Sequence, residues 1–270
     1  MPRTALGIFD EAITVLRLDA TTLLGIAVVV LLPLRLIALA APGSALRDAR
    51  PDQLLDIFVG NLSEPGAVLA AFVTLVLESL ALFVVAASYG DVLAHWYAGR
   101  HRSATDALLA SIRRSPAILV AWAIVHVLEL LLSVFTVGLG VLVFGPILMV
   151  AAPVMGAERA GPFRALRRST VLAAPKYLYC ALVFVLTGVG ALVMRLMIEF
   201  VPSFLGLELL GLPLWSVAGV ADIVATVVQI AFVAAAANVL YLDLRVRREG
   251  IDLYLASQRV FDADRSPADG

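Results

Sequence analysis

The sequence is poor in the residues that soluble enzymes most often use for chemistry. Its 270 residues include one cysteine, three histidines and a single lysine, Lys176. The lone Cys180 cannot form a disulfide within the chain, and it lies in an apolar run. We therefore expect Cys180 to act as a small buried hydrophobic residue.

Recognisable catalytic motifs are also missing from the sequence. There is no HExxH, CxxC or GxSxG motif and no Walker-type phosphate loop. The histidines His95, His101 and His126 are too dispersed to indicate a metal site. Nothing in the charge pattern supports nucleic-acid binding. The sequence thus predicts a protein that is not an enzyme and has no cofactor.

Charged residues are scarce, and apolar residues are abundant. Only 15% of the chain is charged and 61% is hydrophobic, with a mean hydropathy of +0.98. Soluble domains carry about 25% charged and about 45–50% apolar residues. The composition therefore excludes a soluble globular domain and predicts an integral membrane protein.

Long apolar runs define the expected architecture. A helix needs about 20 apolar residues to cross about 30 Å of hydrocarbon. Because backbone polar groups in hydrocarbon must be satisfied within the chain, the runs predict an all-α bundle. The first run exceeds the roughly 7–15 residues of a signal peptide, so we expect it to remain uncleaved. The six predicted transmembrane helices, in one domain spanning 1–270, are residues 21–41, 65–90, 116–137, 139–156, 176–200 and 214–241.

The arginines predict how the chain is threaded. Sixteen of the 20 basic residues lie in four segments. These segments are the stretch before the first span, the connection between spans two and three, the connection between spans four and five, and the stretch after the sixth span. The other connections contain only Arg47 and Arg50. The excess of positive charge marks the cytoplasmic side, so both termini are expected there. Arginine in place of lysine is typical of a high-GC bacterium and suggests a bacterial cell membrane.

Short amphipathic helices are expected beside the spans on the arginine-rich side. Ser103 and Asp106 have the spacing of a capping box, and Gly161-Pro162 is typical of a helix start. The expected apolar faces are Leu6, Phe9, Ile13 and Leu16 in residues 4–18, Ala104, Leu108 and Ile112 in the second helix, Phe163 and Leu166 in the third, and Ile251, Tyr254 and Leu255 in residues 251–261.

Two stretches carry a family resemblance. The first contains Pro153, Glu158, Gly161-Pro162 and Ala165-Leu166-Arg167-Arg168-Ser169, and the second covers residues 239–252. Over residues 151–255 the chain resembles the membrane domain of glycerophosphoryl diester phosphodiesterase and its stand-alone bacterial relatives. In that family the membrane domain is an accessory module and the hydrolase a separate soluble barrel. His101-Arg102 is followed by Ser103 and not by the glycine of the barrel's motif, so the resemblance implies no phosphodiesterase activity.

Charged residues inside the predicted spans are candidates for a functional site, because charge is costly in hydrocarbon. Arg195 and Glu199 are four residues apart and can pair on one helix, whereas His126 and Glu129 share a face. One hypothesis is a polar pocket for a lipid headgroup, an ion or a cationic solute. The other is a set of structural pairs, with some side chains reaching the interface. The candidates are Arg35, Glu78, His126, Glu129, Arg195, Glu199 and Asp222.

A second group of charges lies on the predicted cytoplasmic side. We expect these residues to form a salt-bridged cap that ties the connection between spans four and five to the end of span six. The alternative is a patch that binds anionic lipids. The group comprises Glu158, Arg167, Arg168, Asp243, Arg245 and Arg248.

The fourth predicted span is interrupted by Gly145-Pro146 and Pro153. A broken helix whose free backbone lines a site would explain these residues. A proline-kinked helix that only packs against its neighbours would also explain them.

The sequence therefore predicts a non-enzymatic membrane scaffold or accessory subunit that organises a partner or lipid. The alternative is a small transporter or channel-like protein that uses the polar pocket. Membrane lipids are the expected partners, and a membrane-protein partner or homo-oligomer suits either function.

Overall fold

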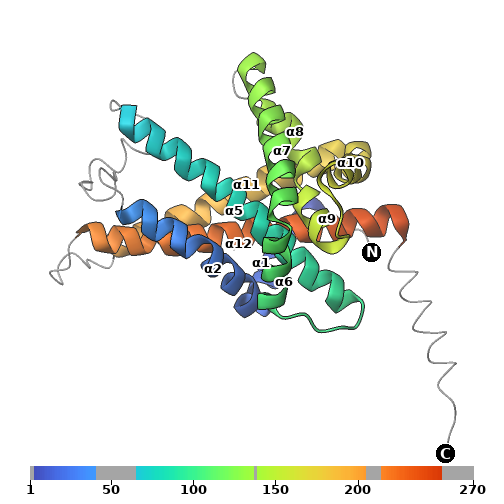
Figure 1. Cartoon of the computed structure of the whole chain (residues 1–270), viewed down its shortest axis with the longest axis horizontal. Coiled ribbons are helices and arrows are strands. Elements are labelled where there is room, and N and C mark those ends of the chain that lie inside the picture. The colour runs from blue at the N-terminus through green and yellow to red at the C-terminus, as the bar shows by residue number, and fades with distance from the viewer. Residues whose placement is uncertain (1–2, 41–64, 137–138, 205–213, 251–270) are drawn as a thin grey trace, which may run out of the picture.

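The computed structural model describes residues 3–40, 65–136, 139–204 and 214–250, and every regular element in them is helical. Figure 1 shows these helices gathered into one bundle. Their bounds are α1 (Ala5–Leu18), α2 (Ala20–Ala40), α5 (Pro65–Tyr97), α6 (Ala104–Arg113), α7 (Ser115–Thr136), α8 (Gly140–Leu148), α9 (Ala151–Ala157), α10 (Pro162–Ala173), η1 (Ala174–Lys176), α11 (Tyr177–Phe204) and α12 (Leu214–Glu249).

Six helical segments in these residues are long and apolar enough to cross a membrane. The predicted all-α bundle with six membrane helices is therefore confirmed. Three helices run further than expected, because α5 continues to Tyr97, α11 to Phe204 and α12 to Glu249. Pro175 does not fully separate α10 from α11. Pro175 lies in the short 3-10 turn η1 between the two helices, and this turn tolerates the missing N–H of proline.

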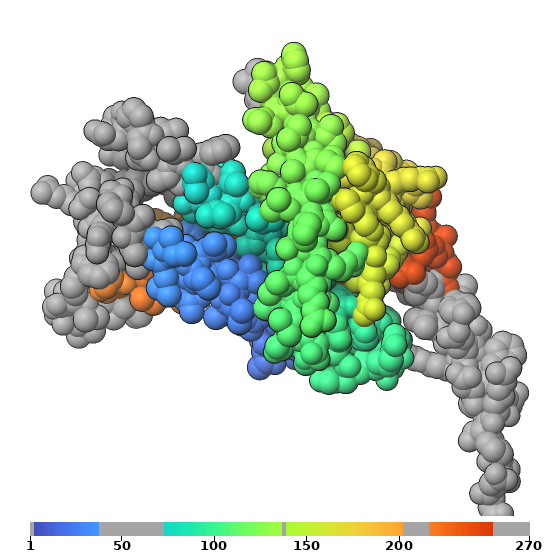
Figure 2. Space-filling model, viewed as in Figure 1, coloured from blue at the N-terminus to red at the C-terminus, as the bar shows by residue number. Residues whose placement is uncertain are grey.

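Helix α12 forms the centre of the bundle. It packs against α1, α2, α5 and α11, and 72% of an 18-residue apolar stretch of α12 is buried, against 17% of such a stretch of α7. The buried run of alanines at residues 234–237 lets the neighbouring helices approach closely. Figure 2 shows α7 crossing the outer face, beside α9 and α10. Large apolar side chains such as Phe135 stay exposed there, as expected for a surface that faces lipid.

A close helix approach joins α5 and α9 and depends on glycine. A Cβ at Gly156 would lie only 1.8 Å from the backbone oxygen of Ala87. A Cβ at Gly90 would lie 2.9 Å from the oxygen of Pro153. Asn238 of α12 joins the same contact, because its side-chain nitrogen donates to the Ala86 oxygen at 3.0 Å.

The fourth span is a broken helix that divides into α8 and α9 at Met149 and Val150. The break lies four residues before Pro153, whose ring excludes a hydrogen bond to the Met149 carbonyl. Neighbouring helices satisfy the carbonyls around the break. Pro146 has no N–H to donate to the Leu142 carbonyl oxygen. The Tyr177 hydroxyl donates to that oxygen instead, at 2.9 Å. Ser169 donates to the Ile147 oxygen at 2.6 Å.

These bonds favour the second interpretation of the fourth span, in which the prolines shape packing. The two carbonyls at Leu142 and Ile147 are used by α11 and α10, although Met149 and Ala152 beside the break line a cavity. The break lets α9 turn its small residues towards α5.

The short helices α1, α6 and α10 form where the sequence predicts them, and most residues of their expected apolar faces pack in or against the core. Thr4 and Ser103 cap the N-termini of α1 and α6, and Pro162 is the first residue of α10. Their buried faces combine small residues such as Ala12 and Ala165 with large ones such as Ile8 and Leu172. Three large residues of the expected apolar faces are exposed: Leu6 (68%), Ile112 (53%) and Phe163 (72%).

The exposure of Leu6, Ile112 and Phe163 fits a protein that is surrounded by lipid. Small residues give close packing inside the bundle, while large apolar ones are stable against lipid. The predicted helix at residues 251–261 lies outside the described residues.

Candidate functional site

Five of the seven charged candidates from the spans meet in one cluster, which we call the intramembrane network: Arg35, Glu78, Arg195, Glu199 and Asp222. Arg35 enters from α2 and is only 6% exposed. Its guanidinium pairs directly with Glu78 of α5 and lies 3.2 Å from the Asp222 carboxylate of α12. It also donates to the Thr226 hydroxyl at 2.7 Å.

Arg195 of α11 forms the other half of the intramembrane network. Its Nε lies 2.6 Å from Glu199, and its Nη2 lies 2.9 Å from Asp222. Glu78 is 3.8 Å away, and the Gln229 side-chain oxygen accepts from Nη1 at 3.3 Å. Asp222 therefore bridges two arginines, and the network joins α2, α5, α11 and α12. Two guanidiniums face three carboxylates in it.

The remaining two candidates, His126 and Glu129, lie on α7 beside a separate cavity of about 330 Å³. The Nδ1 atom of His126 lies 2.9 Å from the Trp122 carbonyl oxygen, and the two rings stack at 4.9 Å. Since a carbonyl oxygen can only accept, Nδ1 carries a proton. Gln229 also lines this cavity and so connects it to the intramembrane network.

Three residues of the predicted cap come together at the arginine-rich end. Glu158 lies 3.0 Å from the Nε of Arg168 and 4.0 Å from that of Arg245. Glu249 pairs with both arginines, and the Tyr241 hydroxyl donates to Glu158 at 3.0 Å. We call Glu158, Arg168, Tyr241, Arg245 and Glu249 the cap cluster. It ties the segment after α9 to α10 and to the end of α12.

The other three predicted cap residues lie elsewhere. Asp243 is 1% exposed and accepts from the Tyr179 hydroxyl and the Arg3 backbone N–H, both at 2.9 Å. It therefore holds the start of the chain against α12. Arg167 and Arg248 are exposed and face outward.

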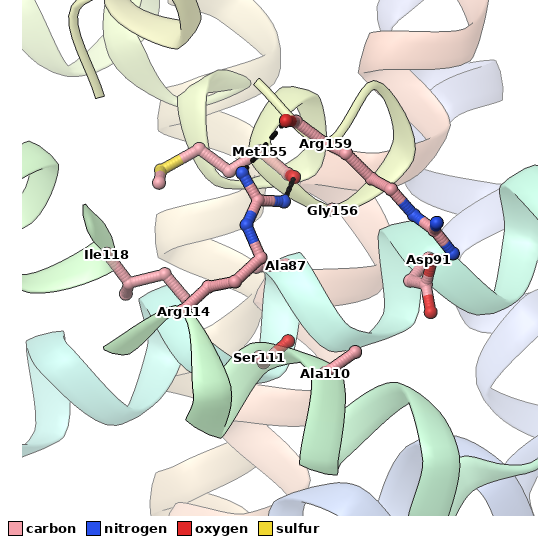
Figure 3. A pocket seen from close by; sticks show the side chains of 9 residues that line it. All are labelled: Ala87, Asp91, Ala110, Ser111, Arg114, Ile118, Met155, Gly156 and Arg159. Atoms are coloured by element: carbon pink, nitrogen blue, oxygen red, sulfur yellow. Dashed lines mark hydrogen bonds and ion pairs between the residues drawn. The ribbon is translucent and has the colours of Figure 1, made fainter. Parts of the chain in front are cut away.

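A third polar cluster was missed at the sequence level because span two was expected to end at residue 90. Asp91, only 4% exposed, continues α5 and lies 2.9 Å from Arg102 and 3.7 Å from Arg159. Arg114 points at the end of α9, where it donates to the carbonyls of Met155, Arg159 and Ala160 at 3.0, 2.9 and 2.7 Å (Figure 3).

This third cluster closes the C-terminal end of α9. The last carbonyls of a helix have no partner within it, and Arg114 supplies one. Arg159 adopts a left-handed backbone with φ of 49° at this turn, which a side chain normally disfavours. The only sequence signal was an acidic residue directly after an apolar run and close to the arginines of the next connection.

The fold and the clusters define a multi-pass helical membrane protein whose charges are paired both inside the bundle and at its arginine-rich end. The described residues hold no group of three or more His, Cys, Asp or Glu placed to bind a metal ion. Comparison with family models, curated proteins and solved structures finds no match to this chain.

Proposed function

We propose that the protein is a non-enzymatic scaffold or accessory module of the bacterial cell membrane, with both termini in the cytoplasm. The observation that carries the proposal is the closed intramembrane network. Each of its carboxylates lies within 4.0 Å of a guanidinium, and the pairs join four helices. Such an arrangement suits a structural clamp.

Paired charges are poor carriers of ions or protons. Breaking a buried pair by removing one partner costs about 3–5 kcal/mol, so each step of a relay through this network would meet a large barrier. The clamp instead gives a reason for placing charge inside the bundle, since it fixes which helices are neighbours.

Lipid is the partner that the surface favours. Phe163, Ile112 and Leu6 present large apolar side chains outward from short helices, and Trp96 is 67% exposed at the end of α5. Aromatic residues at helix ends are common at the membrane interface. Exposed arginines such as Arg167 and Arg248 are free to meet anionic headgroups, with about 1 kcal/mol for each residue near the surface.

The likeness to the membrane domain of glycerophosphoryl diester phosphodiesterase remains part of the proposal. Its two sequence stretches contact each other through the cap cluster, where Glu158 and Arg168 meet Arg245. This contact supports reading the two stretches as one unit with an accessory role.

The alternative function is a small transporter or channel-like protein. One observation favours it, namely the cavity beside His126 and Glu129, which lies within the spans and apart from the paired charges.

The clamp is tested by changing the charge balance of the intramembrane network. Arg35→Gln leaves three carboxylates with one arginine, and we expect it to lower the free energy of unfolding in mixed micelles by about 3–5 kcal/mol. Glu78→Gln leaves two of each and should cost much less. Adding Glu78→Gln to Arg35→Gln should recover part of the loss. Arg164→Gln, which removes an exposed arginine from α10, is the matched control.

Proteoliposomes test the same proposal against transport. The scaffold proposal expects no proton or sodium flux above that of empty liposomes. A flux that Glu78→Gln abolishes while the protein remains folded would overturn the proposal in favour of the transporter.

A further inference from the structure

We propose that the cavity beside His126 and Glu129 binds a hydrophobic organic cation. The cavity lies among α5, α7, α8, α11 and α12 and measures about 330 Å³. That volume is at the lower end of the range for small-molecule sites, about 300–1,000 Å³. The site touches the intramembrane network only through Gln229, and it does not depend on the scaffold role.

Glu129 sets the sign of the ligand's charge. Among the described residues, no arginine, lysine or histidine nitrogen pairs with its carboxylate, whereas every carboxylate of the intramembrane network has such a partner. A carboxylate in a membrane span needs a counter-charge to remain ionised. Glu129 lines the cavity, so a cation in the cavity would supply that charge.

The other polar groups of the wall are suited to orienting such a ligand. Thr187 is 2% exposed, and its hydroxyl has no hydrogen-bond partner in the described part of the chain. Gln229 uses its oxygen to accept from Arg195, so its amide offers the cavity only N–H donors and does not hold the cation. His126 holds its Nδ1 proton towards Trp122, so Nε2 of a neutral ring is an acceptor.

The apolar wall distinguishes an organic cation from a metal ion. Phe83 and Phe184 contribute aromatic rings to the lining, and most of the remaining lining residues are aliphatic. Alkali and alkaline-earth ions need several oxygen ligands at short distance, which this wall does not provide. An alkylammonium group is instead attracted by aromatic faces and gains from contact with apolar surface.

The sharpest probe is a matched pair of ligands that differ only in charge. Benzyltrimethylammonium and neopentylbenzene have the same shape, because a carbon replaces the charged nitrogen in the second. Both are titrated against the full-length protein in nanodiscs, with empty nanodiscs as the reference for partition into lipid. We expect the cation to bind at least tenfold more tightly than the neutral compound.

Variants then assign the preference to the cavity. Glu129→Gln should remove the difference between the two ligands and leave binding of neopentylbenzene unchanged. Asp10→Asn removes one negative charge from an exposed position on α1 and should leave both affinities unchanged. Ala191→Leu adds volume at the cavity wall and should weaken both ligands together.

Several results would overturn the proposal. Equal affinity for the two ligands in the unmodified protein, or binding of neither, would do so without any variant. A preference for the cation that survives Glu129→Gln would place the site elsewhere. The comparison of the two ligands on the unmodified protein needs no substitution. The proposal can therefore be refuted even if a variant fails to fold.

Discussion

At the scale of single residues, glycine and alanine decide how closely the helices approach. Gly156 and Gly90 allow α9 to lie against the backbone of α5, because neither position has room for a Cβ atom. The obstacle in each case is a backbone oxygen, of Ala87 or Pro153, which cannot move aside as a flexible side chain can.

We expect Gly156→Ala to destabilise the protein by about 3 kcal/mol or more, because overpacking here must separate two helices. Gly25→Ala in α2 is the control, since its new Cβ would meet nothing within 4 Å. Alanine favours helix over glycine, so the control should be neutral or slightly stabilising. Unfolding in mixed micelles measures both. Equal effects of the two substitutions would contradict the close approach.

Residue patterns also show what could be predicted from the sequence. Arg195 and Glu199 were expected to pair because helical spacing is local, and they lie 2.6 Å apart. The meeting of Arg35 with Glu78 and Asp222 needed the packing of three helices, which no spacing in the chain encodes. Asp91 was missed because hydropathy marks where apolar residues stop and not where the helix ends.

At the scale of elements, the broken fourth span shows how neighbouring helices compensate for proline. Pro146 has no N–H to give to the Leu142 carbonyl, and Tyr177 donates its hydroxyl there instead. The sequence located the break through its prolines, but it could not choose between a site and a packing device. That choice depends on Tyr177 and Ser169, which lie on other helices.

A double-mutant cycle tests this compensation. Tyr177→Phe should cost about 1 kcal/mol, because it removes the donor to the Leu142 carbonyl. In a Pro146→Ala background, the new N–H can satisfy the same carbonyl, so Tyr177→Phe should then cost close to nothing. Free energies of unfolding for the four proteins give the coupling. An unchanged cost of Tyr177→Phe in both backgrounds would mean that the hydroxyl acts elsewhere.

Element faces were predicted less well than element positions. The rule that large apolar residues face inward comes from soluble proteins, in which water surrounds the outside. Leu6 and Phe163 are exposed, as lipid would allow, whereas Phe9 and Leu166 on the same helices pack against the core as that rule expects. Periodicity locates such helices but does not say which of two apolar faces is inside.

At the scale of the whole molecule, the arginine-rich connections gather at one end of the bundle. Contacts made by Asp91, Arg114, Glu158 and Asp243 join α5, α9, α10 and α12 there, together with the residue that ends α6 and Arg3 just before α1. This convergence is what the predicted threading requires, since all these segments were assigned to one side of the membrane.

We expect that side to be the cytoplasm. In a Cys180→Ala background, cysteines placed at Pro2 and at Ser266 should react with a membrane-impermeant maleimide only after the cells are permeabilised. A cysteine at Ser63 should react in intact cells. Labelling of the terminal positions in intact cells would reverse the orientation that the arginines predict.

The bond between the Arg3 backbone N–H and the Asp243 carboxylate joins residues 240 positions apart in the chain. A ribosome delivers the first helix long before it delivers the last, so α1 lacks one of its main partners while most of the protein is being made. Its final placement must follow the release of α12. A truncated product that lacks α12 would hold α1 only through α2 and α11 and leave part of its packing surface open to quality-control proteases.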